Sequence, residues 1–111
     1  MQRAYLYNIC DLIINLMEKF MIEQVYAELK KLDAVTSSNQ FSRDWLGMEK
    51  SYFRTMKAKN RKPSAKVLAR VSLKLKESGT RLEKNADPRI AIVGHRLIIM
   101  SDKCMKMIFD S

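Results

Sequence analysis

The stretch GMEKSYFRTMKAKNRKPSAKVLARVSLKL, residues 47–75, decides the fold expected for this chain. After the turn residue Gly47, one helical stripe is formed by the apolar residues Met48, Tyr52, Phe53 and Met56. The polar loop KNRK at residues 59–62 and the stop signal Pro63-Ser64 follow. A second amphipathic helix, ending near Gly79, is marked by the apolar residues Val67, Leu68, Val71 and Leu75. The pattern predicts a short helix over residues 50–58, a basic loop and a longer helix.

The chain before Gly47 predicts a long helix, a connector and a short helix. No Gly or Pro interrupts residues 5–32. Their apolar side chains follow the 3-4-3-4 spacing of Leu6, Ile9, Ile13, Leu16 and Phe20. We therefore expect a helix over residues 1–33, apolar around much of its circumference, which favours a role in dimerisation. The segment AVTSSNQ, residues 34–40, is rich in cap and turn formers and predicts a connector to a helix over residues 41–46.

The chain after Gly79 predicts a C-terminal helix. Asp87 and Pro88 are a suitable N-cap and first helical residue, so we expect a helix over residues 87–110, a second candidate for dimerisation. A β-hairpin around residues 90–100 is the alternative, because β-branched residues flank Gly94. With 3 Gly and 2 Pro in 111 residues, the turn-makers of a many-stranded sheet are scarce. The expected fold is one all-α domain over residues 1–111, a bundle of about five helices.

Positive charge is concentrated in the middle of the chain. The formal net charge is +9. Residues 1–41 carry 4 basic and 5 acidic side chains, residues 42–84 carry 13 and 4, and residues 85–111 carry 4 and 3. From Lys50 to Lys76 there are 10 basic residues and no acidic one. Ordinary surfaces mix both signs, so this block indicates a polyanionic partner, with a solvated basic helix face as the structural alternative.

The central segment also resembles the helix-turn-helix of the lambda repressor and Cro type, the Xre-like family, as a divergent small bacterial member. The features that carry the resemblance are Gly47, Met48, the polar stretch 49–51, the pair Phe53 and Met56, the basic loop 59–62, Pro63-Ser64, and the apolar residues of the helix after them. The family's Leu-Ala pair before the turn is replaced by Ser42 and Arg43, and its glycine after the recognition helix by Lys59. The resemblance implies a helix-turn-helix unit at residues 36–79.

The resemblance implies how this unit would contact double-stranded DNA. If Phe53 and Met56 anchor the inner side of the helix over residues 50–58, its outer side is free to enter the major groove. The expected base-contacting residues are Lys50, Ser51, Arg54 and Thr55, with Arg54 first and Lys50 second because both cations can bind guanine. The expected phosphate-contacting residues are Tyr52, Lys57, Lys59, Asn60, Arg61 and Lys62.

These observations favour a sequence-specific DNA-binding transcriptional regulator, with repression as the expected mode and a homodimer as the expected form. The main alternative is a small protein-interaction module, an inhibitor or adaptor, that keeps the same scaffold. Nonspecific binding of RNA or a membrane surface through residues 50–76 is a third reading. An enzyme is not expected, because no catalytic constellation can be assembled from scattered acids and one histidine.

The remaining notable residues predict structural roles and no cofactor or metal. Cys10 and Cys104 form no C-x-x-C pair, which favours a reduced, cytoplasmic chain. No signal peptide or membrane span is expected, because polar residues interrupt the first apolar stretch. Trp45 is expected in the core, and Tyr52 either in packing or on DNA. His95 lacks partners at metal-ligand spacing, so a surface or core role is expected.

Overall fold

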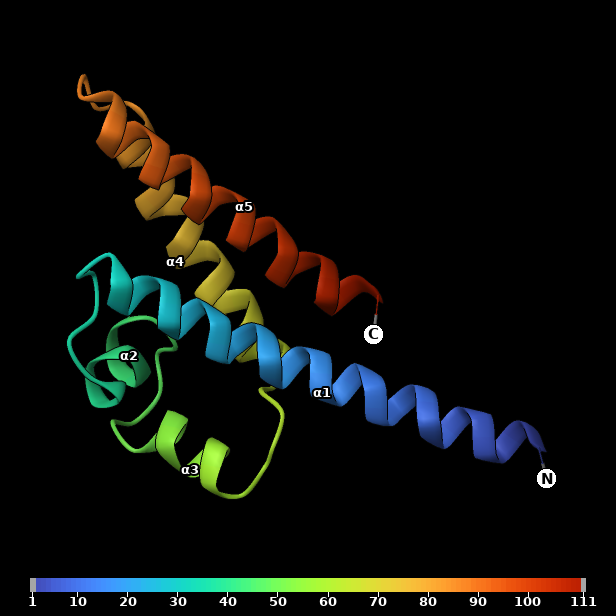
Figure 1. The fold of residues 1–111 in the computed structure, drawn as a ribbon. Helices are drawn as coiled ribbons and strands as arrows, with labels where there is room; N and C mark the ends of the chain where they lie inside the picture. The colour runs from blue at the N-terminus through green and yellow to red at the C-terminus, as the bar shows by residue number, and fades with distance from the viewer. Residues whose placement is uncertain (1, 111) are drawn as a thin grey trace.

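The computed structural model describes the backbone of residues 2–110 and the side chains of residue 13 and residues 16–109. Its elements are α1 (Gln2–Lys31), α2 (Ser38–Asp44), α3 (Tyr52–Ala58), α4 (Ala65–Glu83) and α5 (Pro88–Asp110), shown in Figure 1. No strand occurs within residues 2–110, so the expected all-α bundle of five helices is confirmed. Helix α5 is continuous through Gly94, so the alternative of a hairpin at residues 90–100 is wrong.

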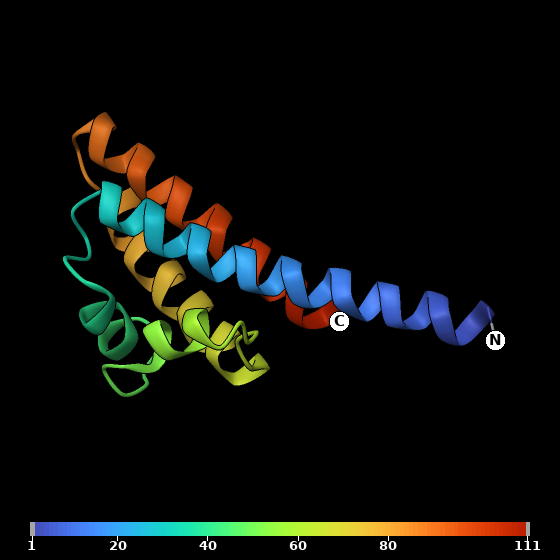
Figure 2. The same ribbon diagram turned by 60° about the horizontal axis from the view of Figure 1, so that its bottom comes forward.

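Helix α1 extends beyond the rest of the molecule. Figures 1 and 2 both show its N-terminal part projecting past the other four helices, and the principal extents of the chain are 58 × 26 × 20 Å. Its C-terminal part carries the core residues Met21, Ile22, Val25 and Leu29. The helix ends at Lys31, two residues before the expected boundary, because Asp33 takes a left-handed backbone conformation with φ 59°.

Helices α4 and α5 form a closely packed antiparallel pair (Figure 1). Gly79 does not end α4 as the sequence predicted, and the helix continues to Glu83. A Cβ at Gly79 would lie 2.6 Å from the carbonyl oxygen of Gly94, so the two glycines allow the helix backbones to approach. Further along the pair, Ser72 Oγ donates to the carbonyl of Ser101 at 2.9 Å, and Ser101 Oγ donates to that of Ser72 at 2.7 Å.

The short helices α2 and α3 are attached to α1 by aromatic packing. Phe41 of α2 and Phe53 of α3 have ring centroids 5.0 Å apart, and Tyr26 of α1 packs on both at 5.2 and 4.9 Å. Trp45 is also buried, at 8% exposure, which confirms its expected place in the core. Residues far apart in sequence thereby join α1, α2 and α3 into one body with α4, whose Val67, Leu68, Val71 and Leu75 complete the core cluster.

Candidate nucleic-acid interface

The connection between α2 and α3 is fixed by one buried serine. Ser42 is fully buried, and its Oγ accepts a hydrogen bond from the backbone N–H of Phe53 at 3.0 Å while donating to the carbonyl of Ser38 at 2.9 Å. Phe53 lies in the first turn of α3, where backbone N–H groups have no partner inside the helix. Ser42 therefore caps α3 from a neighbouring helix, a role that a leucine at this position could not fill.

The turn itself depends on Gly47. Its φ of +66° lies in the left-handed region, and a Cβ there would come within 2.4 Å of the Arg70 side chain. The guanidinium of Arg70 donates to the carbonyl of Gly47 at 2.8 Å, which ties the turn to α4. Gly47 is thus required both for the left-handed backbone conformation of the turn and for the close approach of the Arg70 side chain.

Helix α3 is shorter than the sequence predicted. It begins at Tyr52, with Ser51 as its N-cap residue, so Lys50 precedes the helix. The expected helix over residues 50–58 is therefore wrong at its N-terminus. The hydroxyl of Ser51 donates to the Glu49 carboxylate at 2.7 Å instead of capping the helix. Lys50 is exposed in the turn. Lys50 and Arg54 therefore do not share one helix, although both were expected to contact bases.

The two faces of α3 differ as expected for a helix that presents one side to a ligand. Phe53 and Met56 are 1% and 3% exposed and hold the inner side in the core. Arg54, Thr55 and Lys57 are exposed, Arg54 and Thr55 on the other side of the helix and Lys57 one turn after Phe53. The Lys57 ammonium lies 5.3 Å from the centroid of the Phe53 ring, a cation–π contact that directs this side chain along the helix. Tyr52 is half-buried and packs against the core cluster.

The basic loop after α3 is held by a C-terminal capping motif. Asn60 takes the left-handed conformation with φ 53°, one residue later than the position where the resemblance places glycine. Its N–H donates to the carbonyl of Lys57 at 3.2 Å, and the N–H of Arg61 donates to that of Met56 at 2.9 Å. This is the pair of hydrogen bonds of a Schellman motif. Asparagine tolerates the left-handed region, so α3 ends cleanly without the glycine.

The same loop is fastened to α1 by two polar contacts. Lys62 Nζ lies 3.8 Å from a carboxylate oxygen of Glu18, whose side chain is only 6% exposed. Lys19 Nζ donates to the side-chain oxygen of Asn60. Asn60 and Lys62, both expected on phosphate, are therefore engaged within the protein. Lys59 and Arg61 are exposed on the same loop.

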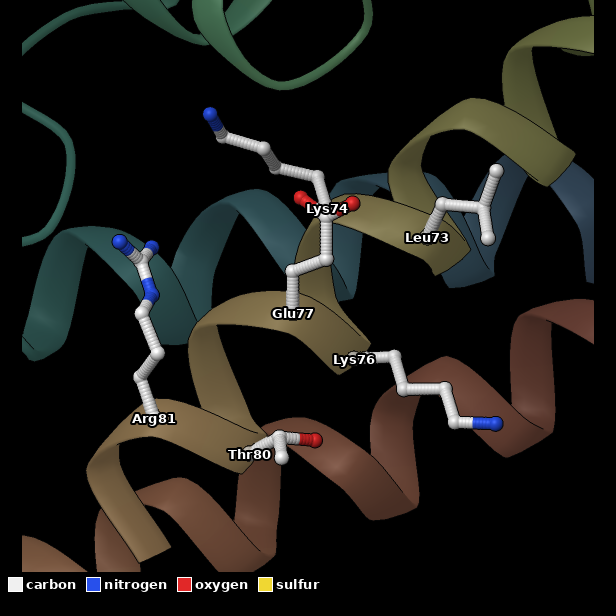
Figure 3. Close-up of a pocket in the computed structure, with 6 residues that line it drawn as sticks. All are labelled: Leu73, Lys74, Lys76, Glu77, Thr80 and Arg81. Atoms are coloured by element: carbon white, nitrogen blue, oxygen red, sulfur yellow. The ribbon is translucent and has the colours of Figure 1, made fainter. Parts of the chain in front are cut away.

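Helix α4 extends the positive surface beyond α3. A hollow of about 620 Å³ on α4 is lined by Leu73, Lys74, Lys76, Glu77, Thr80 and Arg81 (Figure 3). Figure 3 shows Lys74 and Arg81 extending away from α5, whereas Lys76 and Thr80 extend toward the α5 side. The carboxylate of Glu77 lies among these cations, which makes this surface mixed in charge, unlike α3 and its loop.

The structure reveals contributors that the sequence reasoning missed. Glu18 and Lys19 lie on α1, more than 40 residues from the loop that they hold. In the sequence Ser42 is only a departure from the family pattern, and its capping role depends on Phe53, 11 residues further along the chain. Among the side chains that the structure describes, ion pairs join Lys62 to Glu18 and Arg89 to Asp87, His95 lies beside Glu83, and none of these contacts engages Arg54.

No cluster of metal-ligating side chains accompanies this surface among the described residues. No group of three His, Cys, Asp or Glu side chains gathers there. His95 is 68% exposed and lies 3.8 Å from Glu83, which places it on the surface. Burial raises the pKa of the Cys104 thiol to about 11, whereas the Cys10 side chain lies outside the described residues. Within residues 2–110, no helix has the length and apolar character needed to span a bilayer.

The chain belongs to the family of unknown function DUF6626, whose match covers residues 22–110. This range begins within α1, at Ile22, and includes the whole of α2, α3, α4 and α5. Comparisons with curated proteins and with solved structures found no match.

Proposed function

We propose that this member of the DUF6626 family is a DNA-binding transcriptional regulator, a repressor that inserts α3 into the major groove of double-stranded DNA. The observation that carries the proposal is the combination of an anchored inner face and an exposed cationic outer face on one short helix. A run of 10 basic residues without an acidic one surrounds that helix in sequence, and such a field attracts phosphate.

The proposal assigns separate roles to the exposed side chains. Arg54 reads bases, because a guanidinium can bind the O6 and N7 acceptors of guanine together, and Thr55 lies beside it. Lys50 reaches the groove edge from the turn before α3. Lys57, Lys59 and Arg61 bind phosphates and set the orientation of the helix. Ser51 and Tyr52 remain candidate contacts at the start of α3, while Asn60 and Lys62 position the loop through α1.

The proposed setting is the cytoplasm of a bacterial cell, with no catalytic activity, no cofactor and no membrane attachment. A buried free thiol at Cys104 supports a reducing compartment. We also propose that the protein acts as a homodimer, because one module makes few base contacts and paired recognition helices about 34 Å apart read two half-sites.

A randomised duplex library tests this function. The chain is incubated with the library at low and at physiological salt, and the retained DNA is sequenced. We expect an enriched motif, and its enrichment should disappear in Arg54→Gln but persist in Lys106→Gln, an exposed cation on α5 that serves as the matched control. Lys59→Gln should weaken binding to all sequences alike and reduce the salt dependence. Retention without enrichment would refute sequence-specific regulation, and no retention at low salt would refute DNA binding.

A protein-interaction module is the second candidate, favoured by the exposed apolar side chains of α1, where Leu16 and Phe20 are 54% and 62% exposed. Under that function, the double variant Arg54→Glu/Lys57→Glu would keep its partner. Under the proposed function, it would lose all DNA binding. Measuring both partner binding and DNA binding of this one variant separates the two candidate functions.

A further inference from the structure

We propose that one exposed apolar face of α1 pairs with the same face of a second copy of this chain. We define the α1 stripe as Ile13, Leu16, Met17 and Phe20, which are 50%, 54%, 51% and 62% exposed. The opposite face of the same helix is buried in the molecule through Glu18, Ile22, Val25 and Leu29. Helix α1 therefore has two apolar faces, and the fold of one chain covers only one of them.

The spacing of the α1 stripe is that of a coiled coil. Ile13, Leu16 and Phe20 are separated by three and then four residues, the repeat that keeps a seam on one side of a helix. In sequence, Leu6 and Ile9 continue the same repeat, and the backbone stays helical as far as Gln2. This part of α1 projects away from the body in both ribbon views, so a second helix can lie along it (Figures 1 and 2).

Charge selects a second copy over a charged partner. The chain carries a formal charge of +9, so two copies repel each other over most of their surfaces. Residues 1–20 are the exception, because Arg3 and Lys19 balance Asp11 and Glu18. A neutral heptad seam attracts neither a polyanion nor a polycation, whereas it is complementary to an identical seam. Pairing there brings two basic bodies together at the segment where repulsion is weakest.

Other exposed apolar side chains do not form a comparable seam. On α5, Ile92 and Ile99 are 59% and 42% exposed, but the intervening heptad positions hold His95 and Arg96. On α4, Leu73 is 59% exposed, but its neighbours in the hollow of Figure 3 are charged or polar side chains. Among the side chains that the structure describes, the α1 stripe is thus the surface that combines apolar side chains with a heptad repeat.

The α1 stripe also shares its helical turns with the contacts that hold the basic loop. Glu18 and Lys19 lie between Met17 and Phe20 in sequence and bind Lys62 and Asn60. A second copy packed on the α1 stripe would restrain the turn of α1 from which these two contacts originate. The inference rests on the proposed function in this respect, because dimerisation would steady the loop that binds phosphate and join two α3 helices.

Sedimentation equilibrium of the full chain without DNA tests the pairing. We expect the wild-type mass to rise toward two chains with concentration. The double variant Leu16→Glu/Phe20→Glu should raise the dimer dissociation constant by more than about tenfold, because each copy replaces two apolar contacts with like charges. Ile92→Glu is the matched control, an equally exposed apolar residue on α5, and should leave the constant unchanged. Circular dichroism checks that each variant keeps its helices.

The outcomes are distinct. A wild-type chain that stays monomeric, a double variant that still dimerises, or a dimer lost in Ile92→Glu would each overturn the proposal. If the double glutamate variant loses helix content, Leu16→Ala replaces it and must still weaken the dimer. Because the mass is measured without DNA, a failed dimer leaves the DNA-binding proposal standing. Conversely, a monomeric variant that binds one half-site of the enriched motif weakly would support both.

Discussion

Replacing Ser42 with alanine tests whether one hydroxyl group holds the α2–α3 unit together. In the native chain the Ser42 Oγ is the partner of the Phe53 N–H at 3.0 Å, and both residues are buried. Alanine fits the space but leaves that donor without a partner and without access to water. An unsatisfied buried donor costs about 1–3 kcal/mol. Alanine also has a higher helix propensity than serine, by up to about 0.5 kcal/mol, which partly masks the loss.

The control for propensity is Ser78→Ala. Ser78 lies inside α4, is half-buried, and its hydroxyl accepts only a long contact of 3.5 Å from the exposed side chain of Arg81. Both variants gain the same helix propensity, so the difference in their free energies of unfolding isolates the buried hydrogen bond. That difference should be about 1–3 kcal/mol, and the thermal midpoint of Ser42→Ala should be lower by about 4–12 °C for a chain of this size.

Urea and thermal unfolding followed by circular dichroism give the free energy of unfolding of the whole chain. Hydrogen exchange of the Phe53 amide gives the free energy of local opening at α3. We expect this amide to exchange faster in Ser42→Ala, while the amides of the α4–α5 pair keep their protection. Equal stability of Ser42→Ala and Ser78→Ala, with an unchanged Phe53 amide, would refute the capping role.

Three further predictions concern the other contacts. Gly94→Ala should lower the urea midpoint by the equivalent of about 1–3 kcal/mol, because its Cβ would lie 2.5 Å from the Gly79 carbonyl oxygen; a midpoint equal to wild type would contradict the close helix approach. Glu18→Gln should speed both amide hydrogen exchange and trypsin cleavage in the loop at residues 59–62, because it removes the ion pair with Lys62. The control Glu23→Gln, on the same helix, should change neither rate. Equal rates in the two variants would show that the ion pair does not hold the loop. In a Cys10→Ser background, the raised pKa of Cys104, about 11 against 9.0, predicts very slow labelling of this thiol at pH 8. The contribution of the buried neutral thiol to the free energy of unfolding should be present below pH 9 and be lost between pH 9 and 11. Rapid labelling under native conditions would refute the burial of Cys104.

The sequence predicted most of the helices because their signals are local. The apolar spacing around Val67 and Val71 and the Asp87-Pro88 start each involve residues within a few positions of each other. Gly79 was misassigned because a glycine that ends a helix and a glycine that admits a neighbouring backbone look identical in one sequence. The difference depends on Gly94, 15 residues away, and only the packed pair reveals it. The first residue of α3 was misplaced for a related reason, since Ser51 looks like a helical residue although its hydroxyl bonds to Glu49.

The candidate site likewise contains residues whose positions could be predicted from local sequence and residues whose contacts depend on distant parts of the chain. The exposed positions Arg54 and Thr55 followed from the burial of Phe53 and Met56, because one helix cannot bury both sides with so few apolar residues. The contacts that engage Asn60 and Lys62 within the protein could not be predicted in this way, because they depend on Lys19 and on the buried carboxylate of Glu18, both on α1. That dependence has a physical consequence. Glu18 is nearly buried, and the cation near its carboxylate, Lys62 at 3.8 Å, belongs to the loop, so displacing the loop would remove that cation.

Helix α1 is therefore the element on which the proposed functions converge. Its inner face packs on the aromatic rings of α2 and α3 through Tyr26, and its polar residues Glu18 and Lys19 hold the basic loop. Its outer face, the α1 stripe, is open to a second copy. A perturbation of the stripe that weakens dimerisation should consequently also loosen the loop, and, because such a coupling is reciprocal, one that frees the loop should weaken dimerisation by the same factor. The coupling has a structural basis, because the loop contacts α1 through Glu18 on one face and the seam lies on the opposite face of the same turns.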